Sequence, residues 1–140
     1  MRARLLTIVV ALWAGSLVTV CALVAPLMFS FLQDRHVAGE LAGHLFSIES
    51  RLGGILGAIA LILLVRGPTP MRARPAFALI VATGLAPLIS EFALRPFMDN
   101  ANNRADMQTF AALHAVAAGL FGLACVTALA LLWRISQQAK

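Results

Sequence analysis

Apolar residues occur along this chain in four long runs separated by short polar segments. The hydrocarbon core of a bilayer is about 30 Å thick, so a spanning helix needs about 20 mainly apolar residues. The runs at residues 5–32, 75–94 and 110–133 meet this length directly. With a second helix over about residues 41–65, the pattern predicts an all-α protein: a four-helix transmembrane bundle that forms a single integral membrane domain over residues 1–140.

The second helix needs its own argument because its uninterrupted apolar part, Leu52 to Val65, is short. At 1.5 Å per residue this part rises only about 21 Å, which is less than the bilayer requires. The helix must therefore extend toward its N-terminus. This extension brings Glu49 and Arg51 into the outer part of the span.

Prolines and polar residues indicate where the helices end. Pro75 suits a first helical turn, and Pro68 and Pro96 suit helix ends. Residues 98–108 are rich in Asn and Asp, which predicts a polar loop. The first apolar run exceeds the 7–15 residues or so that are usual for a signal peptide, so we expect a retained helix there.

Composition supports the membrane assignment and excludes other classes. Hydrophobic residues make up 61% of the chain and charged residues 12%, against about 45–50% and 25% in soluble domains. The net charge of +5 does not indicate nucleic-acid binding, because the basic residues flank apolar runs and form no separate patch. Cys21 and Cys125 each lie inside an apolar run without a C-x-x-C motif, so we expect both to serve packing.

Basic residues are distributed unequally between the two sides of the membrane. The side with both termini and the loop between helices two and three holds seven of them, and the other side holds four. By the positive-inside rule, both termini are cytoplasmic, in a bacterial inner membrane. The seven are Arg2, Arg4, Arg66, Arg72, Arg74, Arg134 and Lys140; the outer side holds all six acids, Asp34, Glu40, Glu49, Glu91, Asp99 and Asp106.

Three helices carry an ionisable group at a similar depth near the outer face. Counting from the cytoplasmic helix ends places Glu49, Glu91 and His114 roughly 25–30 Å from the inner face. Ionisable groups within a span tend to face a bundle interior and to pair. Arg95 is positioned to pair with Glu91 at i,i+4, and Arg51 with Glu91 or Glu49. These five residues form either a site for a cation, polar solute or cofactor, or a structural clamp near the headgroups.

Other chemistry is sparse. Imidazoles are ligands for transition metals and haem, which makes His44 and His114 the candidates for either. Their spacing matches no ligand signature, so no cofactor is predicted. We find no Ser-His-Asp or Cys-His arrangement and no phosphate-binding glycine loop, and the sequence therefore favours a protein that is not an enzyme.

Small residues recur four apart on three of the helices: Gly53 and Gly57, Ala115 and Gly119, and Ala11 and Gly15. In lipid such faces allow helix backbones to approach closely. They fit packing inside one bundle, a homo-oligomer, or contact with a membrane partner.

Several short motifs resemble the bacterial transmembrane protein 205-like family, a four-helix membrane domain of unknown function. The motifs are Val-Ala-Pro-Leu-Met-Phe at residues 24–29, Ala-Gly-Glu-Leu-Ala-Gly-His-Leu-Phe at 38–46, Leu-Arg-Pro at 94–96 and Phe-Ala-Ala-Leu-His at 110–114. The resemblance implies the same four-helix membrane architecture. The sequence departs from the family pattern at residues 47–51, where many members carry proline and aromatic residues.

Three functions remain open from the sequence. The first is handling of a small solute or metal ion at the outer polar layer. The second is a structural or assembly subunit that uses the small-residue faces. The third is a redox membrane protein with haem held by His114 and His44.

Overall fold

The computed structural model describes residues 2–66 and 70–138, and this part of the chain forms four helices long and apolar enough to cross a membrane. The first comprises α1 (Arg2–Val18), the π-helical turn η1 (Thr19–Val24) and α2 (Ala25–Phe31). The second is α3 (Arg35–Val65). The third comprises α4 (Pro70–Ile89), the π-helical turn η2 (Ser90–Leu94) and α5 (Arg95–Asn103), and the fourth is α6 (Met107–Gln138). The all-α, four-helix prediction is confirmed.

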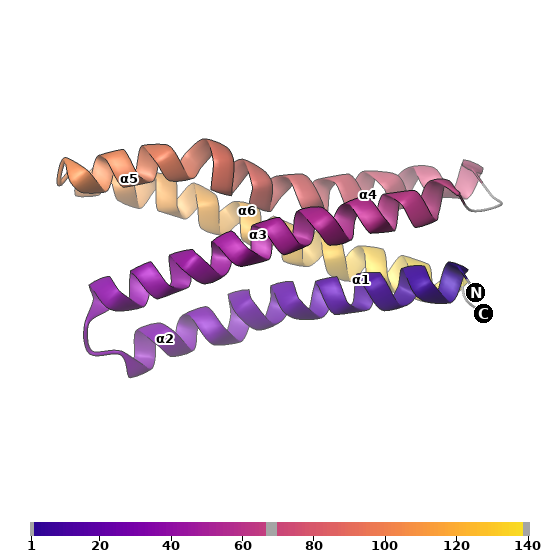
Figure 1. Cartoon of the computed structure of the whole chain (residues 1–140), viewed down its shortest axis with the longest axis horizontal. Helices are drawn as coiled ribbons and strands as arrows, with labels where there is room; N and C mark the ends of the chain where they lie inside the picture. Colours follow the sequence, from indigo (N-terminus) through magenta and orange to yellow (C-terminus); the bar gives the residue numbers. More distant parts are fainter. Residues whose placement is uncertain (1, 67–69, 139–140) are drawn as a thin grey trace.

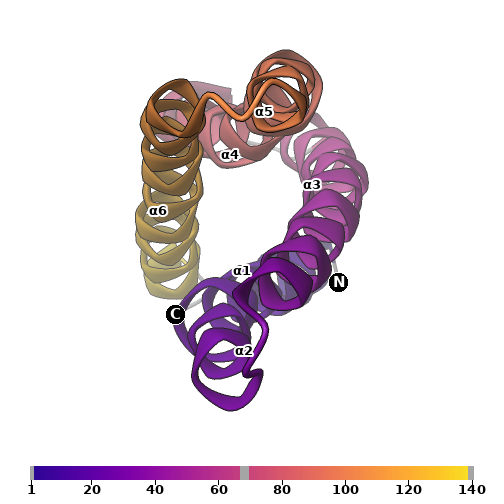
Figure 2. The ribbon, with the colours of Figure 1, turned by 90° about the vertical axis from the view of Figure 1, so that its left-hand side faces the viewer.

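The four helices pack as an up-and-down bundle (Figure 1). Seen from one end, they occupy the corners of a quadrilateral (Figure 2). Both α1 and α4 contact α3 on one side and α6 on the other. The start of α1, the end of α3, the start of α4 and the end of α6 lie at one end of the bundle (Figure 1), as alternating spans require.

One tryptophan fills the centre of the bundle. Trp13 on α1 is 0% exposed, and its indole lies against Gly53 and Gly57 on α3 and faces Gly84 on α4. Between the centre and the end of the bundle away from the termini, Phe46 and Phe121 join α3 to α6 with ring centroids 4.6 Å apart. The glycines on α3 therefore have a packing role inside the bundle, because they leave room for a large aromatic side chain.

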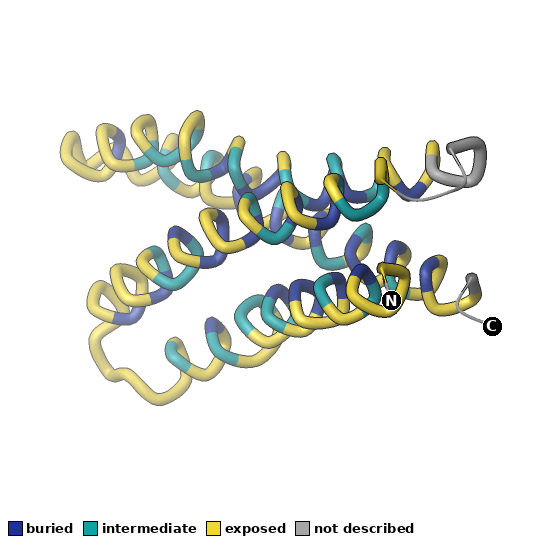
Figure 3. Tube along the Cα trace, turned by 45° about the vertical axis from the view of Figure 1, so that its right-hand side comes forward, coloured by how far each residue is buried: buried dark blue, intermediate teal, exposed yellow. Residues whose placement is uncertain are grey.

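Large apolar side chains cover the outside of the bundle, and contact between this surface and water would be unfavourable. Leu12, Ile48, Ile55, Val65 and Val126 are all more than half exposed. Buried positions face inward on every helix, and exposed positions face outward (Figure 3). Such a surface suits hydrocarbon as its surroundings.

Each π-helical turn ends two residues before a proline. Ala25 N–H bonds to Val20 O ahead of Pro26, and Arg95 N–H bonds to Ser90 O ahead of Pro96. Proline lacks an N–H and its ring clashes with the carbonyl four residues earlier. The wider turn accommodates that ring, and the helix continues. The prediction that Pro96 ends the third helix is therefore wrong.

The prediction of a polar loop at residues 98–108 is wrong for residues 98–103, which are helical. Helix α5 continues to Asn103 with Ala101 buried against the bundle, while its Asn side chains face outward. The connection to α6 is a tight turn: Asp106 N–H bonds to Ala101 O and Ala105 N–H to Asn102 O. This is the Schellman arrangement, with Ala105 at φ 57°.

The other helix ends differ from the predicted ones by a few residues. The predicted extension of the second helix occurs and goes further, to Arg35, where Asp34 accepts hydrogen bonds from the N–H groups of His36 and Val37. Pro75 lies inside α4 rather than in its first turn, because the helix begins at Pro70. Pro68 and Lys140 lie outside the described residues.

Candidate functional site

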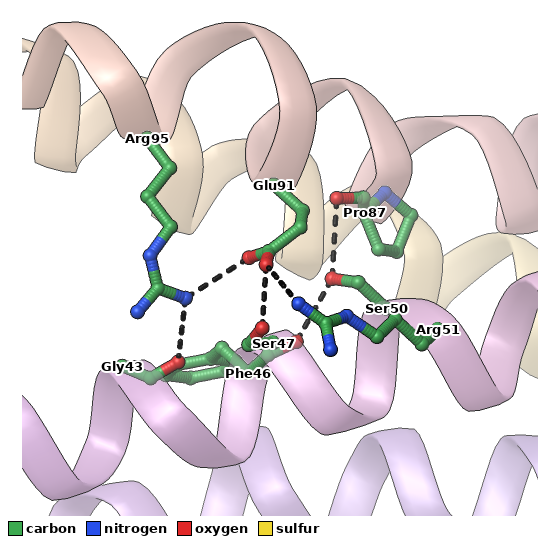
Figure 4. Close-up of polar contacts among 8 residues, drawn as sticks. All are labelled: Gly43, Phe46, Ser47, Ser50, Arg51, Pro87, Glu91 and Arg95. Carbon is green, nitrogen blue, oxygen red and sulfur yellow. Dashed lines mark hydrogen bonds and ion pairs between the residues drawn. The ribbon is translucent and has the colours of Figure 1, made fainter.

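Glu91 is the centre of a polar cluster between α3 and η2 (Figure 4). Its side chain is 10% exposed. Arg95 donates through Nη1 to Glu91 Oε2 at 3.0 Å, across one helical turn, and to the backbone oxygen of Gly43 on α3 at 3.2 Å. The Ser47 hydroxyl donates to Glu91 Oε1 from α3. The predicted Glu91–Arg95 pair is confirmed. Through the Ser47 hydroxyl and the Gly43 carbonyl, the pair also connects its own transmembrane helix to α3.

Arg51 approaches the same carboxylate from the opposite direction. Its Nη2 lies 3.6 Å from Glu91 Oε1, and its side chain is 68% exposed. Of the two partners expected for Arg51, the structure selects Glu91. The Glu91 carboxylate therefore has two guanidinium groups and a hydroxyl around it, and its charge is compensated within the protein.

Two serines complete this cluster, and the sequence reasoning missed both. In addition to Ser47, Ser50 donates to Phe46 O at 2.8 Å and to Pro87 O at 3.2 Å. The second bond binds α3 to α4 at a proline, near η2 (Figure 4). The sequence contains a signal for this face: Ser47 and Ser50 are three residues apart in an apolar helix, so they share a side.

Glu49 belongs to a different interface. It is 4% exposed and accepts a hydrogen bond from the Ser16 hydroxyl of α1 at 2.9 Å. Ser16 also bonds to Trp13 O at 2.9 Å. Among residues 2–66 and 74–137, no Lys, Arg or His side chain forms an ion pair with Glu49. The predicted polar layer is thus divided, with Glu91 between α3 and η2 and Glu49 between α3 and α1.

The two cysteines lie in the first and the fourth transmembrane helix. Cys21 is on η1 and Cys125 is on α6, and these two elements are in contact. Both are half-buried, free, and packed against the hydrophobic core. The sequence predicts a packing role for both, and this agrees with their position against the core.

The histidines do not join either cluster. His114 is exposed on α6, and its ring stacks on Phe110 with centroids 6.0 Å apart. His44 is exposed on α3. No group of three His, Cys, Asp or Glu side chains converges within the described part of the chain. The expectation that His114 faces Glu49 and Glu91 is wrong, because its helical position turns it outward from the bundle.

The indole N–H of Trp13 is a second buried polar group in the interface between α1 and α3. Its Nε1 is buried and has no hydrogen-bond partner among the described residues. It lies above Gly53, one helical turn from Glu49 along the same face of α3. Within the described residues, the α1–α3 interface therefore holds the Trp13 N–H without a hydrogen-bond acceptor and the Glu49 carboxyl without a cationic side chain as its partner.

Comparison with known proteins places the chain in a group without an assigned activity. A family model described as a domain of unknown function (DUF4149) matches residues 8–107. The match includes Cys21, Glu49 and Glu91, and Cys125 lies beyond it. No curated protein and no solved structure matches the chain.

Proposed function

The chain belongs to the DUF4149 family, and we propose that this member is a multi-pass membrane protein that binds a small metal cation at Glu49. The observation that carries the proposal is the burial of Glu49, at 4% exposure, with a single hydroxyl donor and no ion-pair partner in the described structure. A carboxylate buried in this way is costly unless it is paired or neutralised. A bound cation is one means of neutralising it.

The partners of Glu91 differ from those of Glu49, and this difference supports the proposal. Glu91 has Arg95, Arg51 and Ser47 around its carboxylate, so its charge is already compensated and it holds helices together. Glu49 lies on the same helix as Arg51, but the guanidinium group pairs with Glu91 instead. Of the two acids, only Glu49 retains the capacity to bind a cation. The role of a structural clamp belongs to Glu91.

The finer details of location are also part of the proposal. The excess of basic residues near the ends of α1, α3 and α6 supports cytoplasmic termini in a bacterial inner membrane. In that orientation the connections between α2 and α3 and between α5 and α6 face outward. The motifs at residues 24–29 and 38–46 support a relationship to the transmembrane protein 205-like group.

Thermal unfolding in mild detergent tests the proposed function. A ligand that binds only the folded protein stabilises it by about 2.7 kcal/mol at 100 times its Kd. We compare Na⁺, K⁺, Mg²⁺, Zn²⁺ and Ag⁺ as nitrates at constant ionic strength. At least one should raise the Tm of the unmodified protein, and Glu49→Gln should abolish that increase.

The matched control is Glu40→Gln, which makes the same chemical change at an exposed acid of α3. This variant should respond to the cation like the unmodified protein. The proposal fails if no cation stabilises the protein, or if Glu49→Gln responds as strongly as Glu40→Gln.

A second candidate function is assembly with a membrane partner or another copy. Gly15, Gly119 and Gly122 have no heavy atom within 4 Å of where a Cβ would stand, so these small positions are not used inside the bundle. Chemical crosslinking in native membranes, with Gly119→Leu and Gly122→Leu as variants, tests this role. A crosslinked species that persists unchanged in both variants argues against these faces as the contact.

A further inference from the structure

An open cavity of about 250 Å³ lies between α5 and α6. These two elements pack against each other at the end of the bundle away from both termini (Figure 1). The cavity has an apolar part and a polar part. Its lining includes Phe97 and Leu113 in the first, and Asn100, Arg104 and Asp106 in the second.

The apolar part of the cavity lies at the edge of the hydrocarbon core. Phe97 is 23 residues from Arg74 near the start of α4 (97 − 74). Leu113 is 21 residues from Arg134 near the end of α6 (134 − 113). At 1.5 Å per residue, both are roughly 32–35 Å from these basic residues, which is close to the thickness of the hydrocarbon core.

The polar part lies further out, in the headgroup layer. Arg104 is 30 residues from Arg74 (104 − 74), and Asp106 is 28 residues from Arg134 (134 − 106). These separations correspond to roughly 42–45 Å, whereas a bilayer with its headgroups is about 40–45 Å thick. The cavity therefore extends from the hydrocarbon into the headgroups, and it suits a molecule that occupies both.

The two charged residues of the cavity have opposite signs and are exposed. Neither Arg104 nor Asp106 forms an ion pair within the described residues. Asp106 accepts a hydrogen bond from the backbone N–H of Thr109 at 3.1 Å, but a carboxylate has about four lone-pair sites and retains room for a ligand. A headgroup with one anionic and one cationic part would compensate both charges at once.

We propose that this cavity binds one phospholipid whose headgroup carries a phosphate and a primary ammonium, as in phosphatidylethanolamine. The Arg104 guanidinium and the Asn100 amide donate to the phosphate, because guanidinium offers a fork of N–H donors that matches phosphate oxygens. The Asp106 carboxylate accepts from the ammonium, and an acyl chain lies along Phe97 and Leu113. This site is separate from the cation site of the proposed function and does not depend on it.

Three phospholipids test the specificity of the cavity. Phosphatidylcholine has the same phosphate, but its quaternary ammonium has no N–H to donate, and phosphatidylglycerol has the phosphate without a cation. Each is added to delipidated protein in mild detergent, and bound lipid is measured by native mass spectrometry. We expect one phosphatidylethanolamine per chain, bound about three- to five-fold more tightly than either other lipid, since an exposed ion pair contributes little more.

Two substitutions separate the roles of the charged residues. Arg104→Gln should weaken binding of all three lipids by about five- to ten-fold, because all three carry the phosphate. Asp106→Ser should remove the preference for phosphatidylethanolamine over phosphatidylglycerol, and it keeps an oxygen acceptor ahead of α6. Circular dichroism verifies that each variant remains helical, and Asp106→Asn repeats the second test.

The matched control is Arg35→Gln, which makes the same change at an exposed arginine of the other connection at this end of the bundle. It should bind phosphatidylethanolamine like the unmodified protein. The inference is overturned if phosphatidylethanolamine is not preferred, or if Arg104→Gln binds it as tightly as Arg35→Gln. Displacement of the lipid by millimolar inorganic phosphate would also overturn it, because the cavity would then be a site for a free anion.

Discussion

The indole of Trp13 lies directly on Gly53, and a Cβ added at Gly53 would stand 3.0 Å from Trp13 Nε1. Overpacking of a close-packed interior costs typically 1–3 kcal/mol. We therefore expect Gly53→Ala to lower the free energy of unfolding by about 1–2 kcal/mol, measured by thermal or denaturant unfolding in detergent. Gly119→Ala is the control, since it has open space around it. Equal effects of the two substitutions would contradict this packing.

The Glu91 cluster is expected to show unequal coupling to its two arginines. Arg95 lies 3.0 Å from the carboxylate and is one-third exposed, whereas Arg51 lies at 3.6 Å and is 68% exposed. Double-mutant cycles with Glu91→Gln should give about 1–3 kcal/mol for Arg95→Gln and under about 1 kcal/mol for Arg51→Gln. A larger coupling to Arg51 would show that the cluster is arranged differently.

Ala105 is a site where a single substitution should stabilise the protein. It has φ 57° at the end of α5, where the backbone favours glycine, and its side chain is exposed. The left-handed conformation costs a residue with a Cβ roughly 1–2 kcal/mol. Ala105→Gly should raise the free energy of unfolding by up to about 1 kcal/mol, after the extra entropy of unfolded glycine is counted. A lower Tm for this variant would exclude the Schellman turn.

Acid should remove the contribution of Asp106, which precedes α6 outside the membrane-spanning segments. Hydrogen bonds from the side chain and the backbone N–H of Thr109 lower the pKa of Asp106 in the folded protein. A lowered folded-state pKa contributes stability above the unfolded value, about 3.9, and this contribution is lost as the pH falls through the folded-state pKa. The Tm difference between the unmodified protein and Asp106→Asn should therefore be present at pH 7 and shrink toward zero below pH 4 or so. A difference that is independent of pH would contradict this role.

Local regularities of the chain account for most of the bundle. The apolar runs fixed the number of helices, because each needs about 20 apolar residues to span the bilayer. The need to reach that length placed Glu49 in the second helix, and the i,i+4 spacing identified the Glu91–Arg95 pair. Prolines were a poor guide to helix ends, since a π-helical turn lets the third helix continue through Pro96.

The division of the polar layer was decided by tertiary structure. Depth along a helix follows from counting residues, and it put Glu49, Glu91 and His114 at one level. Direction around the helix axis depends on how neighbouring helices pack, and it placed Glu91 against α3, Glu49 against α1 and His114 on the outside. The sequence by itself determined which groups enter the membrane, whereas the packing of α1, α3 and α4 around Trp13 decided which of them meet.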